Sequence, residues 1–430
     1  MPKTFMPSFN NLAELHAHQL KGLQWTVEHA YRGSSFYRRR LAEAGVQPGD
    51  IRTLADIRKL PFTTADDLRD GYPFPLLSVP ESRVVRIHAS SGTTGKRKIL
   101  SYTQKDIDDW IHFFARCYEM AGLTAEDRVQ IAVGYGVWTA GVGFQLGCEK
   151  FGAMAIPAGP GNVDMQCQFL VDLQTTVMCC TASMGLLMAE EVNRRNLQDQ
   201  IALKKMIFGS ERSSEAMRQR IKQLLGLEDM FDIPGMTELY GPGTGLDCYR
   251  HEGVHYWADY YILEMLDPET LEPVPAGEVG EMVVTTLCKE AAPLIRYRTR
   301  DLSRVIEKPC SCGNILPLHD RLLGRSDDMI IFRAVNIYPG QIDEVLSGIS
   351  NAGCEYQVHL ERKDDGRDYM TIRMECCENY EPSRKLELAG MVQREIKKKI
   401  MVSCDVEVVD YCTLPRSERK AKRFFDNRPM

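Results

Sequence analysis

The sequence predicts an α/β protein with a large N-terminal domain, which carries a largely parallel sheet and a β-rich subdomain, followed by a small α+β domain. Strand-like and helix-like stretches alternate from residue 128 to residue 226, which favours parallel strands covered by helices. After residue 253 short strand-like runs are separated by Pro/Gly turns, which predicts antiparallel strands or a small barrel. A chain of 430 residues also exceeds the size at which one hydrophobic core usually keeps growing.

The composition is that of an ordinary globular protein, with 44% hydrophobic and 26% charged residues. A net charge of −6 argues against a general nucleic-acid binder, and no apolar run approaches the ~18 residues that a membrane span needs. The first residues lack the layout of a signal peptide. Fourteen cysteines without an export signal indicate a reducing compartment. We therefore expect a cytoplasmic protein that binds neither nucleic acid nor membrane.

The N-terminal part begins with residues 11–45, whose spacing predicts one or two helices, and Thr64 begins a capped helix. Two β-like runs, VVRIHA and KILSY, lie between residues 84 and 102. Strands are then expected at 128–135, 153–159, 175–182 and 204–211, each followed by a helical stretch.

A boundary is expected near residues 322–332, which divides the chain into domains 1–325 and 326–430. The second domain is patterned as a helix at 341–349, a hairpin at 355–375, a helix capped by Ser383 and a strand at 404–411.

Residues 90–98 read SSGTTGKRK, a run of hydroxyl groups, glycines and positive charge that suits an anion. The Walker A interpretation fails, because only two residues separate Gly92 from Gly95. The alternative is a solvated turn between two strands.

Three further stretches carry candidate site residues, each with an ordinary alternative. Glu238 in FDIPGMTELYGPG suits a magnesium ligand or a plain turn glutamate. Asp301 in RYRTRDLSRV suits a ribose diol or a surface ion pair with Arg300 or Arg304. Lys420 in LPRSERKAKR is, taken alone, typical of a solvated face.

The chain carries five motifs in this order: SSGTTGK, the T-E loop, YRTRD, GRSDD and PRSE-x-K. With these motifs the chain resembles the adenylate-forming superfamily, and most closely the phenylacetate–CoA ligase family, along essentially its whole length. The resemblance implies a mobile C-terminal domain. It also implies ATP- and Mg²⁺-dependent activation of an aryl acid, phenylacetate or a close analogue, to an acyl-adenylate, with transfer to coenzyme A. A homodimer fits the family. The alternatives are another acceptor (a carrier protein or an amine), or a nucleotide-binding regulatory or zinc-scaffold protein without turnover.

The resemblance also implies a role for each matching residue. Lys420 is the catalytic lysine, Glu238 binds magnesium, and Thr237 lies beside the α-phosphate. Asp301 and Arg325 hold the ribose, and Asp327 is the hinge. The remaining ATP-binding set is Ser90, Ser91, Gly92, Thr93, Thr94, Gly95, Lys96, Gly209, Ser210, Glu211, Asp232, Ile233, Pro234, Gly235 and Met236.

Two positions depart from the family pattern. Pro234 stands where relatives usually carry an aromatic residue that stacks on adenine, and Arg419 stands where they often carry glycine. By the same resemblance the acyl pocket falls on Tyr135, Gly136, Trp138 and Ala140, and the absence of a basic residue there favours an apolar acid. The alternative for that stretch is helix packing.

Cys248, His255, Cys310 and Cys312 offer three thiolates and an imidazole, the donor set of a closed structural zinc site. The phenylacetate ligase branch is similar at these places. His251 is the rival of His255, and the alternative is four unrelated residues in surface turns.

Overall fold

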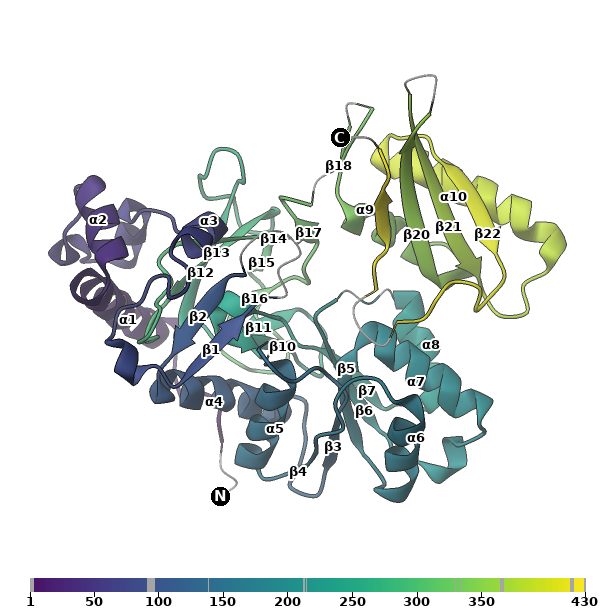
Figure 1. The fold of residues 1–430 in the computed structure, drawn as a ribbon, viewed down its shortest axis with the longest axis horizontal. Coiled ribbons are helices and arrows are strands. Elements are labelled where there is room, and N and C mark those ends of the chain that lie inside the picture. The colour runs from purple at the N-terminus through teal and green to yellow at the C-terminus, as the bar shows by residue number, and fades with distance from the viewer. Residues whose placement is uncertain are drawn as a thin grey trace. The chain divides into compact units, whose positions relative to one another are not determined.

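The computed structural model describes residues 4–90, 97–137, 139–211, 213, 215–328, 330–333, 335–363, 367–417 and 421–428. It divides into two compact units, which are described separately (Figure 1). The first unit is Met1–Gly159, Thr175–Cys179 and Phe231–Leu322, and the second is Pro160–Gln174, Cys180–Met230 and Leu323–Met430.

The first unit begins with helices, as the spacing predicts: α1 (Leu12–Gly33), α2 (Ser35–Glu43) and α3 (Ala65–Asp70). The Thr64 hydroxyl accepts from the Asp67 backbone N–H at 3.3 Å, which confirms the predicted cap. The two predicted β-like runs form the antiparallel pair β1 (Arg86–Ala89) and β2 (Ile99–Tyr102), and α4 (Gln104–Met120) follows.

Parallel strands form the next layer of this unit. Strand β3 (Arg128–Ile131) pairs in parallel with β4 (Met154–Ile156) and with β5 (Val177–Thr181), and α5 (Ala140–Phe151) joins β3 to β4. Helix α5 packs closely on α4, because a Cβ added at Gly147 would lie 2.1 Å from Phe114 Cβ. The β–α–β order confirms the predicted α/β class.

The antiparallel part of the first unit also agrees with its sequence pattern. One sheet has the order β10-β11-β16-β15, and a second contains β12, β13 and β14 in antiparallel register. The short pair β8–β9 precedes them. The strands of this part are β8 (Gly235–Met236), β9 (Gly241–Pro242), β10 (Gly245–Asp247), β11 (Val254–Tyr256), β12 (Tyr261–Leu266), β13 (Gly280–Thr286), β14 (Tyr297–Ser303), β15 (Val305–Ile306) and β16 (Leu318–His319). Strand β7 (Asp229–Asp232) belongs instead to the sheet that contains β3, β4 and β5.

The second unit contains three segments. The first two hold α6 (Val163–Asp172), α7 (Ala182–Arg194), β6 (Lys205–Gly209) and α8 (Glu215–Leu225). The third holds β17 (Gly324–Arg325), β18 (Ile330–Phe332), β19 (Val335–Ile337), α9 (Pro339–Ser347), β20 (Ala352–Arg362), β21 (Asp368–Cys376), α10 (Lys385–Ile400), β22 (Asp405–Val409) and β23 (Phe424–Asp426).

The C-terminal sheet has the order β22-β21-β20-β23, with β20 and β21 antiparallel and both edge strands parallel to their neighbours (Figure 1). Its core joins Val358 and Ile372 of the sheet to Val392 and Ile396 of α10. The hairpin, both helices and the strand at 404–411 are therefore found where the pattern predicts them. Strand β23 was not predicted.

One predicted helix cap is wrong. Helix α10 begins at Lys385, and Ser383 lies in a 3₁₀ turn, Pro382–Arg384, that precedes it. The Ser383 hydroxyl donates to Glu381 Oε1 at 2.6 Å instead of accepting from the helix. Proline in the first position of that turn starts it one residue before the serine.

No helix in the described part of the chain is long and apolar enough to cross a membrane.

Candidate active site

The T-E loop of the first unit is a tight turn between two short strands. Thr237–Leu239 forms one 3₁₀ turn, with β8 before it and β9 after it. A Cβ added at Gly235 would lie 2.3 Å from Pro242 Cα, so only glycine permits this close approach. The turn presents Glu238, which is buried with 5% of its surface exposed.

The Glu238 carboxylate receives two donors in this buried position. The Tyr297 hydroxyl donates to Oε1 at 3.0 Å, and the Lys98 ammonium forms an ion pair with the same oxygen. Burial by itself raises the pKa of Glu238, but Lys98 and Tyr297 outweigh it, and the pKa lies below its ordinary value. The site therefore holds an ionised carboxylate, an oxygen ligand of the kind that Mg²⁺ prefers.

A second lysine, the buried Lys289, supports the backbone of this turn. Lys289 Nζ donates to the Glu238 carbonyl at 3.0 Å and lies 4.4 Å from the centre of the Tyr102 ring. The Tyr102 hydroxyl donates to the Thr237 carbonyl at 2.9 Å. Burial lowers the pKa of Lys289 to about 8, against the opposing charges of Asp106 and Glu238. Both carbonyls of the T-E turn are thus fixed by buried donors.

Much of the predicted phosphate loop lies outside the described residues, namely Ser91, Gly92, Thr93, Thr94, Gly95 and Lys96. Its flanks are described: the Ser90 N–H donates to the Lys98 carbonyl at 3.0 Å. Trp138 and Lys420 also lie outside the described residues.

Other residues predicted to bind the nucleotide lie in the first unit. Asp232 forms an ion pair with Arg321 at 3.1 Å, Ile233 is buried, and the Pro234 carbonyl accepts from the Gly243 and Thr244 N–H groups. Met236 is partly buried.

Asp301 lies in β14, and the two arginines proposed as its ordinary partners pair with other acids. Arg300 lies 3.5 Å from Glu281, and Arg304 lies 2.9 Å from Asp320.

The remaining predicted residues belong to the second unit. Gly209 ends β6, and Ser210 has a positive φ of 67°. Glu211 accepts from the Ser183 N–H at the start of α7 (2.6 Å) and from the Ala421 N–H (2.9 Å). Arg325 and Asp327 form an ion pair with each other at 2.9 Å.

The described residues of the predicted acyl pocket differ in exposure. Tyr135 is 37% exposed and Gly136 is also exposed, whereas Ala140 is buried at the start of α5. The Tyr135 ring lies against Gly141, where an added Cβ would come within 2.5 Å of the ring.

The four predicted zinc ligands form a compact cluster. The ligand atoms of Cys248, His255, Cys310 and Cys312 all lie within 4.8 Å of one another. His255 Nε2 is 3.3 Å from Cys312 Sγ, and Nδ1 is 2.9 Å from the Leu316 carbonyl. A carbonyl only accepts, so Nδ1 carries the proton and Nε2 presents its lone pair to the thiols. The rival His251 pairs with Asp247 instead.

Sequence reasoning missed the side chains that surround Glu238: Lys98, Tyr102, Lys289 and Tyr297. Two of them lie in a motif, Lys98 at the end of SSGTTGKRK and Tyr297 in YRTRD, and this position was the available signal. Tyr102, Lys289 and Tyr297 lie 51 to 135 residues along the chain from the residues that they contact.

Two family profiles match the chain. The AMP-binding enzyme profile matches residues 49–288, and the AMP-binding enzyme C-terminal domain profile matches residues 334–428.

Similar proteins cover nearly the whole chain. Phenylacetate-coenzyme A ligase of Escherichia coli is 39% identical over 96% of this chain and 95% of its own length, and that of Aromatoleum evansii is 40% identical over 97% and 95%. The solved structure of 2-hydroxyisobutyryl-CoA ligase in the postadenylation state with 2-HIB-AMP has a TM-score of 0.88 and 26% identity, over 97% of this chain and 90% of that one. These matches, together with the T-E turn and its ionised glutamate, identify the chain as a member of the phenylacetate–coenzyme A ligase family of AMP-binding enzymes.

Proposed function

We propose that this protein is an acid–thiol ligase that converts an aryl acid, phenylacetate or a close analogue, with ATP and coenzyme A into the aryl-acyl-CoA, AMP and pyrophosphate. The observation that carries this proposal is the buried, ionised Glu238, set in a T-E turn of a chain that is 36–40% identical to four phenylacetate-coenzyme A ligases. The 2-hydroxyisobutyryl-CoA ligase structure with an acyl-AMP supports the same two-step chemistry.

The roles of the residues follow from the charge that develops in the first step. Attack of a carboxylate on the α-phosphate places negative charge on the phosphoryl oxygens and on pyrophosphate. Glu238 would hold Mg²⁺, which neutralises part of that charge, and Lys420 would supply a second cation. A preorganised donor of this kind contributes about 3–4 kcal/mol to the transition state. The proposal also includes the predicted ATP-binding residues, the acyl pocket, the hinge at Asp327 and the domains 1–325 and 326–430.

A panel of aryl and alkyl acids, scored for AMP release with coenzyme A present, tests this function. We expect aryl acids to give the highest rates and the product mass to be that of the acyl-CoA. Lys420→Ala should abolish acid-dependent pyrophosphate exchange. An unchanged exchange rate in that variant would refute the ligase assignment. A product that forms only with a loaded carrier protein or an amine would show that the acyl acceptor is not coenzyme A.

We also propose that the cluster of Cys248, His255, Cys310 and Cys312 binds structural zinc. Three buried or half-buried thiols and one imidazole with a fixed tautomer suit a closed tetrahedral zinc site. The metal would tie β10 and β11 to the turn at 310–313.

The proposed enzyme is a cytoplasmic homodimer. None of the fourteen cysteines, which all lie among the described residues, forms a disulfide, which suits a reducing compartment. The dimer rests on family resemblance, and light scattering of the purified protein tests it.

A further inference from the structure

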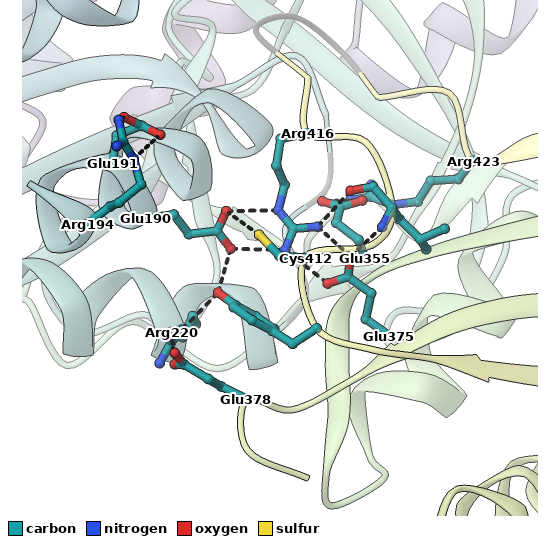
Figure 2. A network of polar contacts seen from close by, with 12 residues as sticks. Glu190, Glu191, Arg194, Arg220, Glu355, Glu375, Glu378, Cys412, Arg416 and Arg423 are labelled. Carbon is teal, nitrogen blue, oxygen red and sulfur yellow. Dashed lines mark hydrogen bonds and ion pairs between the residues drawn. The ribbon is translucent and has the colours of Figure 1, made fainter. Parts of the chain in front are cut away.

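A buried polar network in the second unit joins α7 and α8 to the segment that precedes β23 (Figure 2). At its centre the Arg416 guanidinium lies between two carboxylates, Glu190 of α7 and Glu375 of β21. Nε donates to Glu190 Oε2 at 2.9 Å and Nη2 to Oε1 at 3.0 Å, while Nη1 donates to Glu375 Oε1 at 2.8 Å. Arg416 therefore bridges α7 and the C-terminal sheet.

This bridge is shielded from water. The side chains of Arg416, Glu190 and Glu375 are 9%, 13% and 0% exposed. Burial opposes the charge of Arg416, but its hydrogen bonds to the two carboxylates outweigh this and raise its pKa. Charged pairs held by several hydrogen bonds in a dry setting are much stronger than surface pairs.

Further contacts hold the same segment to the helices. The Tyr411 hydroxyl donates to Glu190 Oε1, and Arg220 of α8 contacts both that hydroxyl and Glu378. On the other side of residues 418–420, the Ala421 N–H donates to Glu211 at 2.9 Å. Glu190 and Glu211 thus anchor the chain before and after the stretch that contains Lys420.

We propose that Glu190 is a positioning residue for the adenylation half-reaction: through Arg416 and Tyr411 it fixes the segment that carries Lys420. This inference rests on the proposed function and on the mobile C-terminal domain that the family resemblance implies. That domain, 326–430, excludes α7; it would bring Lys420 to the site for adenylate formation and carry it away before coenzyme A reacts. Because Glu375 belongs to the same sheet, Arg416 keeps that partner when the segment leaves α7 and gives up only Glu190. Glu190 therefore acts in the first half-reaction and not in the second.

The test is Glu190→Gln, which removes the charge and keeps the shape. Single-turnover formation of the acyl-adenylate should fall about tenfold or more, because truncating one partner of a buried charge pair is costly. Transfer from chemically synthesised acyl-adenylate to coenzyme A should stay within about twofold, as expected for a step in which Glu190 has no part. A purely structural role would lower both half-reactions together.

The matched control is Glu191→Gln, one residue along α7. Glu191 pairs with Arg194 of its own helix (Figure 2) and with Arg195, the residue that follows the helix. Both half-reactions should therefore stay within about twofold of wild type. Tyr411→Phe removes one hydrogen bond to Glu190 and should lower adenylation by about threefold to tenfold. Its effect should not add to that of Glu190→Gln, because both act through one contact.

These measurements distinguish a failure of the proposed ligase function from a failure of the positioning role of Glu190. Wild-type protein that forms no adenylate from any acid overturns the proposed function and this inference together. Active wild type with equal losses in both half-reactions, or with no loss in Glu190→Gln and Tyr411→Phe, overturns the positioning role alone.

Discussion

Glu238 is ionised because specific donors compensate its burial. Removing a carboxylate from water favours its neutral form, and only the adjacent Lys98 and Tyr297 reverse this preference. Lys289 acts on the backbone of the same residue, so it fixes the position of the carboxylate and adds positive potential. The turn therefore combines a rigid backbone with an available anionic ligand.

We predict that Lys289→Met lowers the rate of acid-dependent pyrophosphate exchange by about tenfold to a hundredfold, because the Glu238 carbonyl loses a charged donor in a buried site. Lys105→Met is the control: its ammonium also donates to a carbonyl, that of Cys288 at 2.9 Å, but its side chain is 43% exposed. Equal activity of the two variants would contradict a role for Lys289.

The sequence identified Glu238 but not its surroundings. A glutamate among Gly, Pro and Thr is visible as a motif, whereas Lys289 in TTLCKEAAP has no local signature. Its function depends on burial and on contacts with Tyr102 and Glu238, which only the tertiary fold creates.

At the scale of elements, the candidate zinc cluster joins segments that have little core of their own. The hydrophobic cluster beside β10, β11 and β16 has three buried members, Cys248, Cys310 and Leu318, and two of these are candidate zinc ligands. A metal there would replace a hydrophobic core as the source of stability.

We predict that purified protein retains about one equivalent of zinc after dialysis, as a closed site should. Cys310→Ser/Cys312→Ser should lose the metal and more than about 2 kcal/mol of unfolding free energy. Cys377→Ser, outside the cluster, is the control. Less than about half an equivalent of zinc in the wild type would count against the site.

Elements whose apolar residues recur at a regular spacing were predictable from the sequence, whereas elements that depend on tertiary contacts were not. Helix α7 and the β20–β21 hairpin follow from apolar spacing and turn residues. Strand β23 spans three residues after a basic run, and it exists because β20 offers an edge for parallel pairing. The Ser383 cap failed because Pro382 starts a turn of its own.

At the scale of the whole molecule, buried neutral histidines link stability to pH. Burial lowers the pKa of His88 to about 3, and its Nδ1 donates to the Tyr240 carbonyl at 2.8 Å. Lys289 and Arg86 also disfavour its charged form. In the unfolded chain the pKa of His88 is near 6.5, so below that pH the unfolded state binds a proton at His88, whereas in the native state this histidine stays neutral.

We therefore predict that unfolding free energy falls as the pH drops below about 6.5, by up to about 1.4 kcal/mol per pH unit from His88. Above pH 6.5 both states are neutral at this residue and the effect vanishes. Urea unfolding between pH 7 and 5 measures it, and His88→Gln should show a shallower slope. Identical slopes in the two proteins would refute the contribution.

The order of the motifs was predictable from the chain because it is a linear feature. The domains 1–325 and 326–430 stay a prediction, and the two compact units each combine three separated stretches of the chain. The contacts of Arg416 with Glu190 and Glu375 were not predictable, because they join positions 226 and 41 residues apart. Charged residues at such separations carry no periodic signal, and only the tertiary fold brings them together.

The same network affects the chemical reactivity of the Cys412 thiol. Cys412 is exposed, and its Sγ lies 3.6 Å from Glu190 Oε2. Burial of the sulfur and the negative charge of Glu190 raise the pKa of this thiol, so it reacts slowly with alkylating reagents while the segment stays on α7. In the proposed cycle, departure of this segment from α7 would remove both influences and make the thiol more acidic and more reactive. Its alkylation rate would then report which half-reaction the enzyme is carrying out.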